Sequence, residues 1–199
     1  TSEGYFAVMA LYMAILLGVQ AVLLGSGIIA KEETDKTAEY LYEKPITRFE
    51  GLVSKTLLAL SVIIILNIIS TVFSLIIVGA FSEGPLITGE ILFLMPSVFF
   101  IQLLFLFIGL AFASIMKKPK RSRMLASSVL LITFVFSTAV DISDKYNFLR
   151  YLSPFKYFDA KEIFIDGRYN VGHIIIALLF IAVIFTISQV VYKKRDLDI

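Results

Sequence analysis

The chain alternates long uncharged runs with short charged segments. Its 199 residues contain five runs without Asp, Glu, Lys or Arg, at 4–30, 56–82, 91–116, 124–140 and 170–192. A helix rises about 1.5 Å per residue, so roughly 20 residues cross the ~30 Å hydrocarbon core of a bilayer. Four runs reach that length, and the shorter fourth run reaches it when the polar residues before it snorkel. The pattern predicts an all-α, polytopic membrane protein with spans at about 5–30, 52–81, 91–116, 123–140 and 170–192.

Composition supports a membrane protein and excludes several kinds of site. The chain is 58% hydrophobic and only 17% charged, which leaves too few charges to cover a water-soluble domain. It contains no cysteine, so disulfides, thiolate metal sites and a cysteine nucleophile are excluded. We therefore expect one transmembrane domain over residues 1–199.

The basic residues indicate which segments face the cytoplasm. Thirteen of the 18 Lys and Arg residues lie in 31–55, 117–123 and 193–195. Because Lys and Arg concentrate on the cytoplasmic side, these segments are expected inside, with Ile199 cytoplasmic and Thr1 outside. Parity then places the balanced segment 141–169 outside as well. An outside start without a cleavable signal favours one further span upstream, which makes six in the whole subunit.

Small residues recur at helical spacing along the first run. Such patterns let helix backbones approach closely in lipid. They predict packing within one subunit, and the alternative is a seam between two subunits. The residues are Ala10, Ala14, Gly18 and Gly25.

Polar side chains inside the spans are few, and no Asp, Glu, Lys or Arg lies deep in any span. This composition argues against a proton- or sodium-driven carrier, which usually needs charged groups in the membrane. The amides are expected to be hydrogen-bond partners between helices rather than substrate ligands: Gln20, Asn67, Gln102 and Gln189. The sequence therefore indicates no substrate-binding residues.

We find no sequence motif for catalysis, a metal site or ATP binding. The stretch 79–86 has two glycines at phosphate-loop spacing, but Pro85 and Leu86 stand where Lys and Ser or Thr are required. A membrane-embedded enzyme would need a Ser/His, paired-Asp or metal constellation in its spans. We expect a protein that is not an enzyme and that binds no cofactor itself.

The segment 141–169 is rich in aromatic residues that alternate with charges. Tyr, with an apolar body and a polar tip, suits the membrane interface. Ser153 and Pro154 divide the segment into two pieces. We expect two short helices that lie on the outer leaflet or dip into it, as a surface lid or a re-entrant gate. The candidate gate residues are Tyr151, Pro154, Phe155 and Phe158.

The segment 31–51 predicts a short cytoplasmic helix between two spans. Apolar residues at helical spacing give it an amphipathic face over about 35–43, and Pro45 ends it. Thr47 and Glu50 then form a capping box that starts the next span. An apolar face on so short a helix favours a groove to fill, in lipid headgroups or in a partner protein.

This segment resembles the signature region of ATP-binding-cassette (ABC) permeases of the second exporter class. The family pattern is matched at Glu33, Thr37, Glu39, Leu41, Pro45, Arg48 and Lys55. The stretch 151–158 resembles the family's Leu-Ser-Pro-Phe motif before the last span, and the basic C-terminal flank agrees. Lys36 and Ser54 depart from the pattern, at positions where the family usually or often has Gly.

The resemblance implies a permease that pairs with a second permease, identical or not, and with cytoplasmic ATPase subunits. ATP and Mg²⁺ would be bound by the ATPase. The short helix would be the coupling helix that contacts it, through Thr37, Ala38, Glu39, Leu41, Tyr42, Pro45 and Arg48.

We expect export of a hydrophobic or amphipathic substrate, such as a peptide or an antibiotic, across a bacterial cytoplasmic membrane. A channel-like or structural subunit of a larger membrane complex is the alternative.

Overall fold

Five long helices dominate the structure. The computed structural model describes residues 2–28, 48–81, 88–116 and 118–194, and all regular structure in these residues is helical. Five helices are long and apolar enough to cross a membrane, which confirms the prediction of an all-α fold with five such helices. They are α1 (Ser2–Gly27), α4 (Arg48–Phe81), α5 (Thr88–Ile115), α6 (Pro119–Ile142) and α9 (Val171–Lys194). The predicted coupling helix at 35–43 lies outside the described residues.

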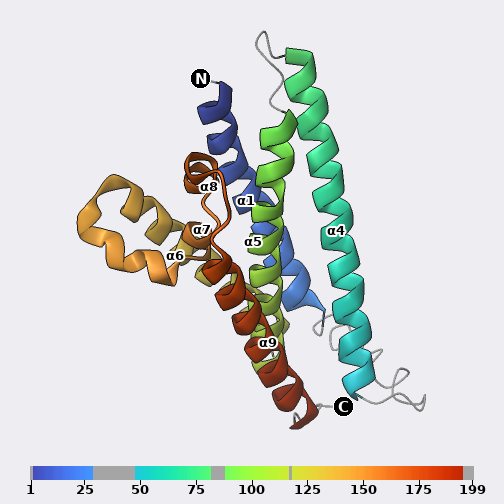
Figure 1. Ribbon diagram of the computed structural model, residues 1–199. Coiled ribbons are helices and arrows are strands. Elements are labelled where there is room, and N and C mark those ends of the chain that lie inside the picture. The colour runs from blue at the N-terminus through green and yellow to red at the C-terminus, as the bar shows by residue number, and fades with distance from the viewer. Residues whose placement is uncertain (1, 29–47, 82–87, 117, 195–199) are drawn as a thin grey trace.

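Helix α5 is the centre of the bundle. It packs against α1, α4, α6 and α9, and Figure 1 shows α1 crossing behind it and α4 running beside it. Its sequence is apolar on all sides, which is typical of a helix with neighbours all around it. Phe105, Leu106 and Leu110 are fully buried. The other helices are therefore best described by how each one meets α5.

Helix α1 meets α5 at backbone distance. A Cβ atom added to Gly25 would lie 2.1 Å from the Leu106 carbonyl oxygen, and one added to Gly109 would lie 2.5 Å from the Val22 carbonyl oxygen. Neither position has room for a side chain, because the obstacle is backbone rather than a flexible side chain. The α1–α5 contact thus depends on one glycine from each helix, and the sequence pattern identified only Gly25.

Helix α4 is the longest helix and is much less enclosed. It begins at Arg48, directly after the Thr47 of the predicted capping box, and continues unbroken to Phe81. In Figure 1 it runs the full height of the molecule on one side of α5. Only 11% of its most apolar window is buried, against 72% for α5. Most of its surface therefore faces lipid or a partner.

Three short helices connect α6 to α9. They are the 3-10 helix η1 (Asp144–Leu152), α7 (Pro154–Tyr157) and α8 (Ala160–Asp166). The chain breaks at Ser153, as predicted, and again at Asp159, whose side chain accepts a hydrogen bond from the Lys161 backbone N–H at 2.9 Å. Gly167, with φ of 60°, ends α8 in the left-handed region that favours glycine. Sequence reasoning missed the second break because a single capping Asp is a weak signal.

Candidate functional site

The segment from α7 to Tyr169 runs along α5, and its contacts show how deep it lies. The Tyr169 hydroxyl donates to the Phe93 carbonyl oxygen at 2.5 Å. The ring of Phe158 stacks on Phe100 with centroids 4.9 Å apart, and the ring of Phe155 lies 5.3 Å from that of Phe105. From Phe93 to Phe105 is 12 residues, which is roughly 18 Å along a helix axis. The α7 end of the segment therefore lies beside the middle of α5.

This depth follows from local sequence. Pro154 starts α7 with a fixed φ, and the Ser153 hydroxyl donates to the Thr133 carbonyl oxygen of α6 at 2.8 Å. The ring of Phe155 also contacts Phe134, 5.8 Å away. The segment is thus fixed between α5 and α6. Of the two alternatives for 141–169, this geometry favours the re-entrant arrangement over a surface lid.

The four candidate gate residues have different environments. Phe155 and Phe158 are 1% and 2% exposed, and Pro154 is buried beside them. Tyr151 is 75% exposed, and its carbonyl oxygen accepts a hydrogen bond from the Tyr157 hydroxyl at 2.5 Å. The structure therefore brings Pro154, Phe155 and Phe158 together in the bundle and leaves the Tyr151 side chain at the surface.

A buried lysine stands among these aromatic residues. Lys156 has a side chain only 2% exposed, and its Nζ donates to Asp141 at 2.6 Å and to Asp159 at 2.5 Å. Burial by itself lowers the pKa of this ammonium, but the hydrogen bonds and charges of the two carboxylates outweigh it, so the pKa lies above its ordinary value. Lys156 is therefore charged at neutral pH and links α7 to α6, through Asp141, and to the start of α8, through Asp159.

Sequence analysis missed Lys156 because it searched for ionisable groups only within the apolar runs. The signal that could have found it is a lysine between Phe155 and Tyr157, with Asp159 three residues later. A second interaction in the same region joins Arg150 to Glu162 and so connects η1 to α8.

Tyr169 secures the other end of the segment. Burial raises the pKa of its hydroxyl to about 12, against a smaller opposing effect of a backbone hydrogen bond from Ser97. The hydroxyl is therefore protonated at neutral pH and can donate to Phe93. Its ring also packs on that of Phe93, with centroids 5.2 Å apart.

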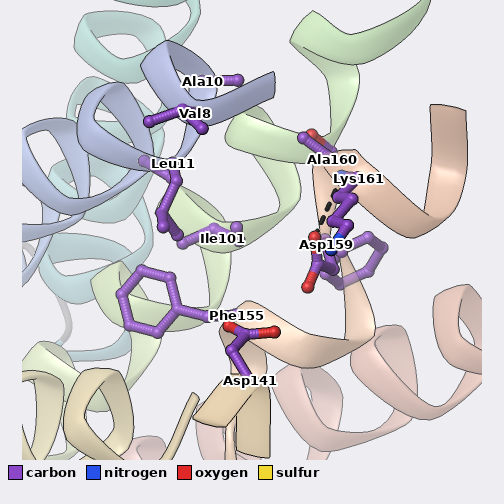
Figure 2. Close-up of a pocket in the computed structure, with 12 residues that line it drawn as sticks. Val8, Ala10, Leu11, Ile101, Asp141, Phe155, Asp159, Ala160 and Lys161 are labelled. Carbon is purple, nitrogen blue, oxygen red and sulfur yellow. Dashed lines mark hydrogen bonds between the residues drawn. The ribbon is translucent and has the colours of Figure 1, made fainter. Parts of the chain in front are cut away.

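A cavity of about 330 Å³ lies between α1, α5 and the α7–α8 segment. Figure 2 shows Val8 and Leu11 of α1 on one side, with Phe155, Asp141 and Asp159 facing them. The walls are mostly apolar, and the carboxylates of the Lys156 network stand at one edge. The volume is at the lower end of the range of ligand pockets. This cavity, with Phe155 and Phe158 in its wall, is the candidate functional site.

The small residues of α1 face elements of the same chain. Ala10 and Ala14 are each 2% exposed and line the cavity. A Cβ atom added to Gly18 would contact Leu130 of α6 and Phe105 of α5, and Gly25 lies against α5 as described above. In this structure all four positions are used for packing within one subunit.

The remaining candidate residues divide into two groups. Those of the predicted coupling contact from Thr37 to Pro45 lie outside the described residues, and Arg48 is the first residue of α4. The described residues contain no group of three or more His, Cys, Asp or Glu that could hold a metal ion.

The chain matches a known protein family. The family described as "ABC-2 family transporter protein" matches residues 2–197, which is nearly the whole chain. No curated protein sequence matches.

Proposed function

We propose that this chain, which belongs to the ABC-2 transporter family, is the membrane subunit of an ATP-driven exporter. Members of this family are permeases without an ATPase domain of their own. The energy would come from a separate ABC ATPase that binds ATP and Mg²⁺ and docks on segment 31–51. A second permease subunit would complete the pathway.

The observation that carries the proposal is the unbroken α4. It starts at Arg48, directly after the predicted coupling segment, and its 34 residues extend roughly 51 Å without a kink-forming proline. A rigid helix of that length would carry a displacement from the ATPase contact to the far side of the membrane. Sparse contacts between α4 and its neighbours favour such movement.

The buried end of the α7–α8 segment supports an outer gate. Phe155 and Phe158 fill the space between α5 and α6 at the depth of the bundle centre, and the cavity opens beside them. Displacing these two rings would widen the cavity. The mostly apolar walls with a charged edge suit a hydrophobic or amphipathic substrate, such as a peptide or an antibiotic.

The ATPase contact is tested at Leu41, on the apolar face of the predicted coupling helix. In Leu41→Asp the new carboxylate would be buried unpaired in the contact, which costs several kcal/mol. We expect normal membrane levels, loss of ATPase copurification and loss of export. Lys36→Ala, on the polar face, is the matched control and should keep all three. Undiminished copurification and export in Leu41→Asp would contradict the coupling role.

The orientation is tested by thiol labelling, since the chain has no cysteine of its own. The exposed positions Thr88 and Asn147 should react as cysteines with an impermeant reagent on intact bacterial cells, whereas the exposed Lys120→Cys should not. This result would place Thr1 outside and Ile199 in the cytoplasm of a bacterial plasma membrane. Labelling at Lys120→Cys would reverse the topology.

The alternative is a channel-like or structural subunit of a larger complex. That alternative needs no ATPase, so wild-type copurification with an ABC ATPase argues against it. If the wild-type chain copurifies with other membrane proteins and no ATPase, the alternative is favoured.

A further inference from the structure

A small cavity lies between the start of α4 and the end of α9. Its volume is about 110 Å³, and it is lined by Phe49 of α4 and by Gln189, Val190, Tyr192 and Lys193 of α9. The two helices contact each other, and Figure 1 shows the start of α4 and the end of α9 at the same end of the bundle. The volume is well below the range of ligand pockets, so the cavity suits a single polar headgroup rather than a whole cargo molecule.

The cavity wall contains a hydrogen-bond donor that calls for an acceptor. The Gln189 Nε2 is buried and has no hydrogen-bond partner in the described part of the chain. A buried polar group without a partner is strongly disfavoured in apolar surroundings. Lys193 follows four residues later, so it lies about one helical turn away on the same face of α9. One acceptor group in the cavity can therefore bind both the amide and the ammonium.

The charges around the cavity favour an anionic acceptor. The Lys193 side chain is exposed, and the described residues that line the cavity include no Asp or Glu. Two further basic residues, Arg48 and Lys194, adjoin lining residues in the chain, whereas Glu50 adjoins Phe49 without lining the cavity. A phosphate group has several oxygens that accept hydrogen bonds, and hydrogen bonds between charged partners are the strong ones. The donors and charges therefore match a phosphate.

An apolar stripe leads from the cavity towards the middle of the bilayer. Val190 lines the cavity and is half-exposed, and the half-exposed Ile187 and Val183 continue the same face of α9 at helical spacing. These residues precede Lys193 in a helix that ends at Lys194, so they lie deeper in the membrane than the cavity. Acyl chains can lie on this stripe, whereas a free phosphate ion would leave it uncovered.

We infer that this cavity binds the headgroup phosphate of an anionic phospholipid, with the Gln189 Nε2 and the Lys193 Nζ as hydrogen-bond donors. The acyl chains continue along the stripe that starts at Val190. Anionic lipids of the cytoplasmic leaflet attract basic residues near the ends of spans, and this end of the bundle is the one expected in the cytoplasm. The bound lipid joins the start of α4 to the end of α9, beside the expected ATPase contact.

The test uses the full membrane subunit in detergent micelles, with the shift in Tm on addition of lipid as the readout. The probes are phosphatidylglycerol, which is anionic, phosphatidylcholine, which has no net charge, and inorganic phosphate, which has no acyl chains. Gln189→Met removes the amide donor without changing the charge, and Lys193→Met removes the ammonium. Lys194→Met is the matched control, because this exposed lysine does not line the cavity.

We expect phosphatidylglycerol to raise the Tm of the wild type more than phosphatidylcholine does, and inorganic phosphate to leave it unchanged. Gln189→Met should need about tenfold more phosphatidylglycerol for the same shift, as expected for the loss of one hydrogen bond to a charged group. Lys193→Met should lose more of the response than Lys194→Met, which measures the general attraction between surface charges.

Three results would overturn the inference. An unchanged response to phosphatidylglycerol in Gln189→Met would mean that the cavity is not the binding site. Equal losses in Lys193→Met and Lys194→Met would mean that the lipid binds through surface charge alone. A rise in Tm with inorganic phosphate as large as that with phosphatidylglycerol would mean that the acyl chains play no part.

If the variants do not fold, the wild type decides the question in phosphatidylglycerol bilayers. Solid-state NMR transfer between the lipid phosphorus and the labelled side-chain nitrogen of Gln189 is expected, and its absence would overturn the inference. Neither measurement needs ATP hydrolysis or export. Failure of this lipid site would therefore leave the proposed function intact, and loss of ATPase copurification would leave the lipid site intact.

Discussion

Helices α1 and α4 both pack on α5, but they do so in different ways. Helix α1 approaches α5 until backbone touches backbone, at Gly25 and Gly109, and its small residues leave little room for movement. Helix α4 offers large apolar side chains to its surroundings, and its Asn67 side chain donates a hydrogen bond to Gln102 of α5. Their sequences are similarly apolar, so hydrophobicity does not distinguish them.

The difference teaches that the two contacts depend on different forces. In lipid there is little hydrophobic drive between helices, so close van der Waals packing and polar contacts determine which helices stay together. The α1–α5 pair is held by extensive close van der Waals packing. Helix α4 has less van der Waals packing against α5 and relies on a pair of hydrogen-bonded amides. We therefore interpret α1 and α5 as a rigid unit and α4 as the element that moves.

The largest expected effect comes from the α1–α5 contact. In Gly25→Ala the new methyl group would lie 2.1 Å from the Leu106 carbonyl oxygen, so the two helices must separate. We expect a loss of stability at the upper end of the usual overpacking range, about 3 kcal/mol, seen as a lower Tm of the purified subunit.

The matched control for Gly25→Ala is on α4. A Cβ atom added to Gly79 meets nothing within 4 Å, so Gly79→Ala should be neutral or stabilise the helix by up to about 1 kcal/mol. Equal losses at the two glycines would contradict the distinction between a tightly packed α1 and a loosely packed α4.

The next effect concerns the buried ammonium of Lys156 on α7. Lys156→Met leaves Asp141 and Asp159 without their shared partner. Removing one member of a buried ion pair can cost 3–5 kcal/mol, but Asp141 is half exposed, and we expect about 2 kcal/mol. The exposed Lys145→Met should change the Tm little. A loss no larger than in Lys145→Met would mean that the network does not hold α7 in place.

The pH dependence of this contribution has a definite sign. The pKa of Lys156 in the folded protein lies above the ordinary 10.5, so the stabilisation is fully present below the pKa of the unfolded chain. It is lost only as the pH rises through the folded value. The Tm difference between wild type and Lys156→Met should therefore be constant between about pH 7 and pH 9, whereas a decline over that range would contradict the raised pKa.

Sequence patterns predicted the five apolar helices well, because the absence of charge over some 20 residues is a property of each segment alone. They also identified Gly25 and the aromatic residues Phe155 and Phe158. What they missed depends on partners from distant segments. Gly109 has Ala113 four residues later, but its close approach to α1 appears only when the two helices are placed together. Lys156 looks like a surface lysine until Asp141 is placed beside it.

The smallest effect is expected on the outer surface of α4. Ile68 and Phe73 are 57% and 60% exposed, and lipid chains can replace most contacts that an alanine loses there. Ile68→Ala and Phe73→Ala should each change the free energy of unfolding by less than about 0.5 kcal/mol. On α5, by contrast, Leu106→Ala removes a fully buried side chain and should cost about 2–5 kcal/mol.

Comparing these alanine variants shows what covers α4 in the membrane. For each variant, the free energy of unfolding is measured in mixed micelles, and the oligomeric state is measured on the purified subunit. If α4 faces lipid, the two α4 variants keep both the wild-type stability and the wild-type oligomeric state. If Ile68→Ala destabilises the subunit nearly as much as Leu106→Ala, the surface of α4 is packed against protein. In that case α4 belongs to the rigid unit, and the movement that drives export must be sought in another helix.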